Sequence, residues 1–320
     1  MGRLAMNQVP QLNKVNATLL ESYEIDCQLR ALSQGTIRSN RSNIRTVGKH
    51  LESLNLNYVD IDNEALKQIL DYLINTRKVR YKTLDGYFTA LSSFYEFLQF
   101  EKHVPGNPIL AFRKRYLKRY KKTQNQSTRK LITVDEMSML INGTLEIRDR
   151  AIMTVFAKTG VRRGELITMD LEDIDWGNER IKLKPKNKRS NLYVYFDNET
   201  AIILKKWMRT RDLYNGTTPA LFIGEQGNRI GRNVLYNLVT KHAQRMGLHN
   251  LDSPRLEDHF SPHCFRHWFT THLRRNGMNR EFIKELRGDS RGEAIDIYDH
   301  IDHQELRKAY LAAIPRLGLF

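Results

Sequence analysis

The sequence predicts a mainly α-helical protein with a small antiparallel β-sheet, in which a helical domain precedes a mixed domain with a β-hairpin. Three observations predict this architecture. Apolar residues recur at steps of three and four over most of residues 16–112, the spacing of amphipathic helices. Three short strand-like segments lie close together between residues 174 and 196. A polar and strongly basic linker, residues 113–130, separates the two parts, and 320 residues are enough for two cores.

The first part is expected to contain four helices, after a flexible N-terminal stretch at residues 1–15. A break at Ser33–Thr36, with Thr36 as the N-cap, separates the first two helices, and Asp60–Asp62 introduce the third. The fourth is dense in aromatic residues, which we expect to fill a core. The apolar residues that define the four helices lie within 19–27, 37–51, 65–73 and 84–98.

The second part, residues 131–320, opens with a capping box in which Thr133 and Glu136 cap one helix start. A helix over residues 148–158 is expected to end at Thr159-Gly160. The expected strands are 174–176, 180–183 and 192–196, with Gly177-Asn178 joining the first two, and the later helices cover 201–210, 232–246, two segments between 262 and 286, and 304–314.

Charge is the strongest compositional signal, with a net +16 over the chain. Residues 1–130 hold 22 Lys and Arg against 11 Asp and Glu, so this shorter part carries +11 and residues 131–320 carry +5. Such an excess predicts a polyanionic partner, most often nucleic acid. The sequence contains no apolar run long enough to predict a membrane span. Its two cysteines give neither a disulfide framework nor zinc-ligand spacing. A cytoplasmic, nucleoid-associated location is therefore expected.

Two basic segments are the candidate DNA-binding surfaces. On the second expected helix, cations follow one another at about one-turn steps, and no acidic residue lies between Thr36 and His50. A solvated helix face is the common alternative, but contact with the DNA backbone fits the missing acids better. The linker adds seven cations in ten positions at residues 113–122. The predicted DNA-binding residues are Arg38, Arg41, Arg45, Lys49, Arg113, Lys114, Arg115, Lys118 and Arg119.

The stretch from Ser261 to Tyr298 carries the strongest chemical signal. His263 and Arg266 are three apart, so on a helix beginning at Pro262 their side chains share one face. Arg162 lies at the start of another expected helix, and Arg presents a planar donor fork to phosphate oxygens. Tyr298 follows in polar surroundings with no core to fill. A metal site at His263, Cys264 and His267 is not expected, because no carboxylate lies between the histidines and no third ligand is evident.

The order of these motifs resembles the tyrosine recombinases of the phage integrase family, over essentially the whole chain. The family pattern is Arg, Lys, His-x-x-Arg, His or Trp, and Tyr, and residues 16–112 resemble its helical (SAM-like) core-binding domain. Where the family usually has LGH, this chain reads RGD. By carry-over the catalytic residues are Arg162, Lys186 (chosen over Lys184 and Lys188 on the same loop), His263, Arg266, Asp289 and the nucleophile Tyr298.

The resemblance implies a site-specific recombinase that cuts and rejoins double-stranded DNA through a 3′-phosphotyrosyl intermediate and a Holliday junction. The two arginines would do work that a metal ion does elsewhere, so no metal or other cofactor is expected. The expected partners are a specific DNA site, a homotetramer on synapsed sites, a dimer or monomer off DNA, and accessory DNA-bending proteins. The segment Gln304–Ile314 would be a C-terminal tail helix that docks on a neighbouring protomer. A noncatalytic DNA-binding protein and, less favoured, a topoisomerase are the alternatives.

Overall fold

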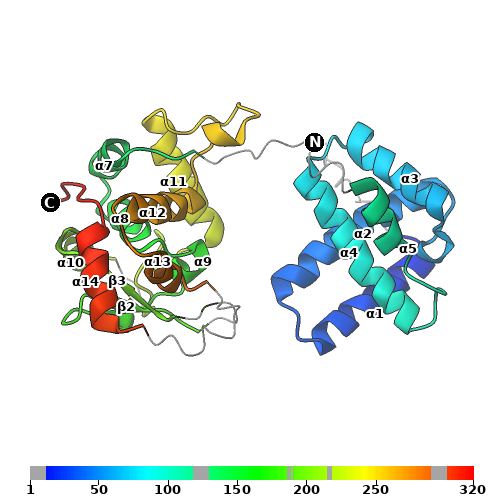
Figure 1. Cartoon of the computed structure of the whole chain (residues 1–320), viewed down its shortest axis with the longest axis horizontal. Coiled ribbons are helices and arrows are strands. Elements are labelled where there is room, and N and C mark those ends of the chain that lie inside the picture. The colour runs from blue at the N-terminus through cyan, green and yellow to red at the C-terminus, as the bar shows by residue number, and fades with distance from the viewer. Residues whose placement is uncertain (1–11, 118–129, 186–188, 190, 215–217, 290–300) are drawn as a thin grey trace, which may run out of the picture. The chain divides into compact units, whose positions relative to one another are not determined.

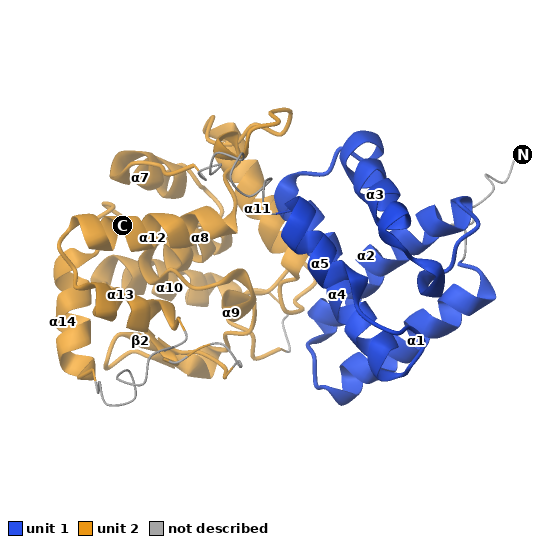
Figure 2. Cartoon of the chain, turned by 45° about the vertical axis from the view of Figure 1, so that its right-hand side comes forward, with its two compact units in different colours: residues 1–126 blue, residues 127–320 orange. Residues whose placement is uncertain are grey.

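The computed structural model describes residues 12–117, 130–185, 189, 191–214, 218–289 and 301–320, and the chain divides into two compact units, residues 1–126 and 127–320 (Figure 2). Most of the described residues are helical, and the sheet has three strands, which confirms the predicted fold class. Within the described residues, no helix is both long and apolar enough to cross a membrane.

Unit 1 is a helical bundle around one apolar core. Its helices are α1 (Lys14–Leu29), α2 (Gln34–Ser53), α3 (Asn63–Asp71), α4 (Tyr81–Phe100) and α5 (Pro108–Phe112), with a 3₁₀ turn at Tyr58–Asp60 and π-helical turns at Tyr72–Thr76 and Arg113–Leu117 (Figure 1). The four predicted helices are present, and α5 is additional. Ser33, not Thr36, caps α2: its hydroxyl accepts from the Thr36 backbone N–H at 3.1 Å.

Tyr58 lies at the centre of this bundle and explains a helical glycine. Its hydroxyl donates to the Ile44 carbonyl at 3.0 Å, and its own carbonyl accepts from the Tyr95 hydroxyl at 2.5 Å. A Cβ atom at Gly48 would lie 2.1 Å from the Tyr58 hydroxyl oxygen. A glycine in mid-helix costs about 1 kcal/mol relative to alanine, and here it lets the Tyr58 ring approach the backbone of α2.

The basic segment that we expected to be linker begins inside unit 1. Residues 113–117 form a helical turn, and Leu117 is buried in the core of the unit. Arg113 donates to Asp85 and Thr89 on α4, each at 3.0 Å. The helical domain therefore extends beyond residue 112, the boundary we expected, because these side chains attach the turn to α4.

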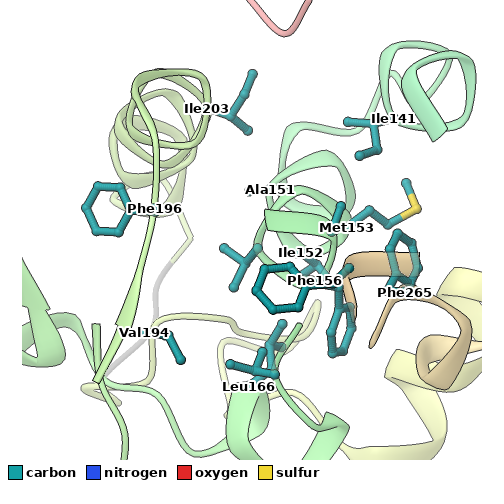
Figure 3. Close-up of a cluster of buried hydrophobic side chains, with 14 of the residues drawn as sticks. Ile141, Ala151, Ile152, Met153, Phe156, Leu166, Val194, Phe196, Ile203 and Phe265 are labelled. Atoms are coloured by element: carbon teal, nitrogen blue, oxygen red, sulfur yellow. The ribbon is translucent and has the colours of Figure 1, made fainter. Parts of the chain in front are cut away.

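Unit 2 is organised around α8 (Ile147–Thr159), which is buried along nearly its whole length (Figures 1 and 3). The sheet has the order β1-β2-β3 and is antiparallel, with Ile181 opposite both Ile174 and Val194. The other elements are α7 (Val134–Asn142), α9 (Arg163–Ile167), β1 (Ile174–Asp175), β2 (Arg180–Lys182), β3 (Tyr193–Tyr195), α10 (Asn198–Arg211), α11 (Arg232–Arg245), α12 (Pro262–Arg275), α13 (Arg280–Arg287), α14 (His303–Ala313) and 3₁₀ turns at 171–173 and 256–258. Thr133 caps α7 in the predicted capping box with Glu136.

The C-terminal helix α14 packs into the core of its own domain, where we had expected a tail that docks on a neighbouring protomer. Leu306 and Tyr310 are fully buried, and the Tyr310 hydroxyl donates to the Lys158 carbonyl at 2.9 Å. The chain after α14 is held by the Lys158 centre, which we define as Lys158, Asp197 and Glu199. Lys158 pairs with both carboxylates and donates to the Pro315 carbonyl at 2.8 Å, so the tail completes this domain's own core.

Candidate active site

Arg162 is held by the tight turn that joins α8 to α9. Gly160 ends α8 with φ at +60°, and a Cβ atom there would lie 2.4 Å from the Phe269 ring, so only glycine fits. Arg162 is the next helix's N-cap, and its backbone N–H donates to Glu165 at 2.7 Å. The Arg162 guanidinium donates to the same carboxylate at 3.0 Å. Glu165 thus fixes the side chain and backbone of Arg162 together.

Helix α12 supplies His263 and Arg266 from its first two turns, with Pro262 at its first position as predicted. Arg266 is buried and donates to the Gly160 carbonyl at 2.9 Å, so α12 is tied to the turn that carries Arg162. Burial, with the nearby Arg162 and Arg287 charges, lowers the pKa of Arg266 to about 10. The group still carries its charge at neutral pH. His263 is exposed and lines a pocket that it shares with Arg162 and Arg266.

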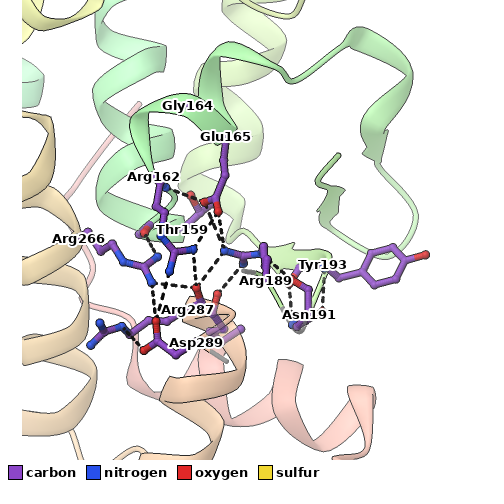
Figure 4. Close-up of polar contacts among 12 residues, drawn as sticks. Thr159, Arg162, Gly164, Glu165, Arg189, Asn191, Tyr193, Arg266, Arg287 and Asp289 are labelled. Atoms are coloured by element: carbon purple, nitrogen blue, oxygen red, sulfur yellow. Dashed lines mark hydrogen bonds and ion pairs between the residues drawn. The ribbon is translucent and has the colours of Figure 1, made fainter. Parts of the chain in front are cut away.

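Asp289 lies where these arginines converge (Figure 4). One carboxylate oxygen accepts from Arg266 at 3.1 Å and from Arg162 at 3.4 Å, and the other pairs with Arg287 at 2.9 Å. A carboxylate at this position can accept but cannot donate at neutral pH. The structure therefore brings Arg162, Arg266 and Asp289 together as one ionic group.

Three residues of this group were missed by the sequence interpretation: Glu165, Arg189 and Arg287. The Arg189 side chain is almost fully buried and donates to Glu165 at 3.3 Å and to the Leu286 carbonyl at 2.8 Å. Burial raises the pKa of Glu165, but Arg189 and Arg162 outweigh it and the pKa lies below its usual range. The Glu of TGVRRGEL follows Arg162 by three residues, which is capping-box spacing and could have identified Glu165. Nothing local distinguished Arg189 from the lysines of its loop.

One backbone carbonyl joins three of the arginines in this group. We call the group the arginine cluster: Arg162, Arg189, Arg266 and Arg287 with the acids Glu165 and Asp289. The Arg287 carbonyl, at the C-terminus of α13, accepts from Arg266 at 2.8 Å, Arg189 at 3.0 Å and Arg162 at 3.3 Å. A helix C-terminus is favourable for cations. Gly288 follows with φ at +58°, and a Cβ atom there would lie 2.3 Å from Arg189.

Of the candidate lysines, only Lys184 lies within the described residues. Its ammonium donates to Asp173 at 2.8 Å and pairs with Asp170 at 3.1 Å, and these bonds raise its pKa. Lys184, which follows the central strand β2, is therefore engaged in structural ion pairs. Lys186, Lys188 and Tyr298 lie outside the described residues. The rival phenol, Tyr310, is buried, and burial raises its pKa well above the usual value, which confirms the prediction that it packs.

The predicted DNA-binding residues of unit 1 are not equivalent. Arg41 pairs with Glu24 on α1 at 2.7 Å, so an acidic partner absent from α2 itself is supplied by the neighbouring helix. Arg113 is likewise held by Asp85. Arg38 is exposed and donates to the backbone of its own helix, and Arg45 and Lys49 form no ion pair within the described part of the chain. Lys114 and Arg115 are exposed, and Lys118 and Arg119 lie outside the described residues.

The structure offers no support for a metal site at His263, Cys264 and His267. Cys264 is buried, and its thiol donates to the His259 carbonyl at 3.6 Å. Among the residues that the structure describes, no three His, Cys, Asp or Glu side chains are grouped so that they could hold a metal ion.

The comparisons with known proteins agree with one another. The model of the phage integrase family matches residues 118–305, more than half of the chain. Tyrosine recombinase XerC of Vibrio parahaemolyticus is 27% identical over 316 residues, which are 96% of this chain and 96% of that protein. Tyrosine recombinase XerD of Staphylococcus epidermidis is 24% identical over 93% of this chain and 99% of its own length.

Solved structures share the fold at low sequence identity. A lambda integrase tetramer bound to a Holliday junction aligns with a TM-score of 0.67 and 16% identity, over 89% of this chain and 77% of that one. The XerH recombinase bound to its difH substrate aligns with a TM-score of 0.63 and 19% identity, over 91% of this chain and 83% of that one.

Proposed function

The chain belongs to the phage integrase family, and we propose that within it this protein is a site-specific DNA recombinase that cleaves and rejoins DNA through a 3′-phosphotyrosyl intermediate. One observation carries the proposal. Arg162 and Arg266, more than a hundred residues apart, direct their guanidinium groups at one carboxylate oxygen of Asp289. That oxygen marks where a non-bridging phosphate oxygen would bind, because both are anionic acceptors for the same two forks.

In the proposed reaction, the phenol oxygen of Tyr298 attacks the scissile phosphorus, and the bond to the 5′ oxygen breaks. A phenol with a pKa near 10 needs a base at neutral pH, and His263, which lines the pocket, is the candidate. Arg162 and Arg266 would stabilise the charge on the pentavalent phosphorane. Lys186 would protonate the leaving oxygen, and the engagement of Lys184 with Asp170 and Asp173 supports this choice. The reverse attack by a 5′ hydroxyl rejoins the strands without ATP.

The proposed partners follow from the same reaction. The protein binds a specific double-stranded DNA site, and basic side chains of unit 1 and the linker contact its backbone phosphates. Within the described residues these are Arg38, Arg45, Lys49, Lys114 and Arg115; Lys118 and Arg119 lie outside them. Strand exchange through a Holliday junction calls for a homotetramer on two synapsed sites, as in the lambda integrase structure; off DNA the protein would be a dimer or monomer, with DNA-bending proteins as accessories. Such a protein acts on the nucleoid in the cytoplasm.

The nucleophile assignment is tested by Tyr298→Phe on a nicked suicide substrate that traps the covalent intermediate. We expect DNA affinity to stay within about twofold, the protein–DNA adduct to disappear and cleavage to fall to background, because only the attacking oxygen is removed. Tyr310→Phe is the matched control and should keep the adduct, since its hydroxyl is buried and donates to the Lys158 carbonyl. An adduct that survives in Tyr298→Phe would show that another residue attacks.

A noncatalytic DNA-binding protein on the same fold is the second candidate, and Asp289 is the observation that favours it. A carboxylate paired with both phosphate-binding arginines competes with the phosphate for them. If wild-type protein binds its site tightly yet gives no adduct on the suicide substrate at any pH, this second function is the better one.

A further inference from the structure

The pocket that holds Arg162, His263 and Arg266 extends beyond them. It has a volume of about 380 Å³ and is also lined by the start of α11 and by the residue after Arg162. Among the residues that the structure describes, four arginines and a histidine face it, and none of the lining residues is a carboxylate. The polar residues concerned are Arg162, Arg163, Arg232, Tyr236, Ser261, His263 and Arg266. A pocket lined by these cationic side chains selects an anion.

The arginines of this pocket fall into two pairs with different surroundings. Arg162 and Arg266 reach acids that lie outside the pocket, Glu165 and Asp289. Arg163 and Arg232 form no ion pair and no side-chain hydrogen bond within the described ranges of the chain. Two guanidinium groups that face one pocket without an acid repel each other, and an anion between them would remove that cost.

The surroundings of Arg163 agree with this description. It is half-buried, and burial, followed by the charge of Arg232, lowers its pKa. Arg163 and Arg232 are the first residues of α9 and α11, so each is placed by a helix start. Tyr236 lies one turn after Arg232 on α11 and offers a phenol donor to the same space.

We propose that Arg163 and Arg232, with the Tyr236 hydroxyl, hold a second phosphate of the DNA strand, next to the one held by Arg162 and Arg266. The inference rests on the proposed function and extends it. Consecutive phosphates of one strand are the anions that a continuous pocket would meet together, and Arg forks bind each of them bidentately. The second phosphate would fix the strand so that the scissile phosphorus stays in line with the nucleophile.

The test is a methylphosphonate scan of the recombination-site duplex, mapped first by footprinting. One neutral methylphosphonate replaces each phosphate around the scissile position in turn, and the salt dependence of Kd is measured for wild-type protein and for Arg163→Gln/Arg232→Gln. In wild type, neutralising the adjacent phosphate should weaken binding and lower the slope of log K against log salt by about 0.9. In the double variant the slope should already be lower, and the same neutralisation should add nothing.

Three controls keep the inference apart from its alternatives. Arg245→Gln removes an exposed arginine from the far end of α11, outside the pocket, and should keep the full methylphosphonate effect. Arg163→Lys/Arg232→Lys should recover the salt slope, and an unchanged melting temperature of each variant should show that the fold is intact. These are binding measurements, so they stand whether or not Tyr298 forms an adduct.

Two outcomes would overturn the second phosphate site. A methylphosphonate effect of equal size in wild type and the double variant would show that these arginines do not meet that phosphate. A loss in the variant that depends on the neighbouring base pair would show that they read a base edge, since Arg also pairs with guanine.

Discussion

Two of the buried charged groups in unit 2, the Lys158 centre and the arginine cluster, differ in their balance of charge. In the Lys158 centre one ammonium meets two carboxylates and a backbone carbonyl, and the lysine has no exposed surface. In the arginine cluster four guanidinium groups meet two carboxylates, and the Arg162 side chain is 41% exposed. The first group lies between α8, α10 and the C-terminal tail, and the second opens on a pocket.

This difference distinguishes buried charges that stabilise the fold from charges that are available to bind a ligand. A buried ion pair adds little net stability, but removing one partner leaves an uncompensated charge and costs several kcal/mol. In the Lys158 centre the ammonium already meets two carboxylates and a carbonyl, so this cation lacks no acceptor. The arginine cluster retains an excess of cations even after Glu165 and Asp289 are counted, and Arg163 and Arg232 add to it. An anion from outside the chain is the natural complement of the second group.

Lys158→Met should have the largest effect on stability. It leaves Asp197 and Glu199 without their cation and releases the chain at Pro315, so we expect the free energy of unfolding to fall by roughly 3–5 kcal/mol. Denaturant unfolding followed by tryptophan fluorescence would measure it. Lys206→Met, on the exposed face of α10, should change it by less than about 0.5 kcal/mol. Similar losses for the two variants would mean that the Lys158 centre is replaceable.

Glu165→Gln should have a somewhat smaller effect, about 2–3 kcal/mol, because Arg162 and Arg189 keep their other acceptors. The pKa of Glu165 lies below its usual range in the fold. Its stabilisation is therefore complete above the unfolded pKa of about 4.3 and is lost as the pH falls through the folded pKa. Unfolding measured between about pH 3 and 7 should show a shallower acid loss in the variant than in wild type. Parallel pH curves would contradict this.

Asp289→Asn should change binding more than stability, since the carboxylate is one-third exposed. If Asp289 competes with phosphate for Arg162 and Arg266, its neutralisation should tighten site binding about three- to tenfold, the effect of removing one nearby like charge in a partly screened site. Titration at fixed salt gives the value. A loss of cleavage with unchanged Kd would instead assign Asp289 to the chemical step.

Arg113→Ala and Lys114→Ala should have the smallest effects and should differ in kind. Arg113 bonds Asp85 and Thr89, so its loss should lower the stability of unit 1 by about 1 kcal/mol, allowing for solvent screening. Lys114 is exposed and should leave stability unchanged while lowering the salt slope of DNA binding by about 0.9 if it meets one phosphate. A normal slope in Lys114→Ala would remove it from the DNA surface.

Local sequence patterns predicted much of the fold and three residues that line one pocket, Arg162, His263 and Arg266. The Thr133 capping box, the Gly160 stop and the His-x-x-Arg spacing each depend on residues within one helical turn, so they could be read without tertiary structure. The ion-pair partners of the charged side chains could not be predicted from local patterns. Glu24 lies 17 residues before Arg41, and Arg189 meets Glu165 across 24 residues. The amphipathic face of α14 predicted burial correctly but could not say against which surface.

The anchor of the arginine cluster is a main-chain oxygen, which has a consequence for mutational scanning. Any substitution at residue 287 keeps that carbonyl, so replacing the Arg287 side chain reports on its pairing with Asp289 and on its charge near Arg266, but not on the anchor. The three guanidinium contacts depend instead on the left-handed backbone at Gly288, where every other side chain is strained and would meet Arg189. In an alanine scan, the importance of this carbonyl would therefore appear at Gly288, a residue with no side chain, and not at Arg287.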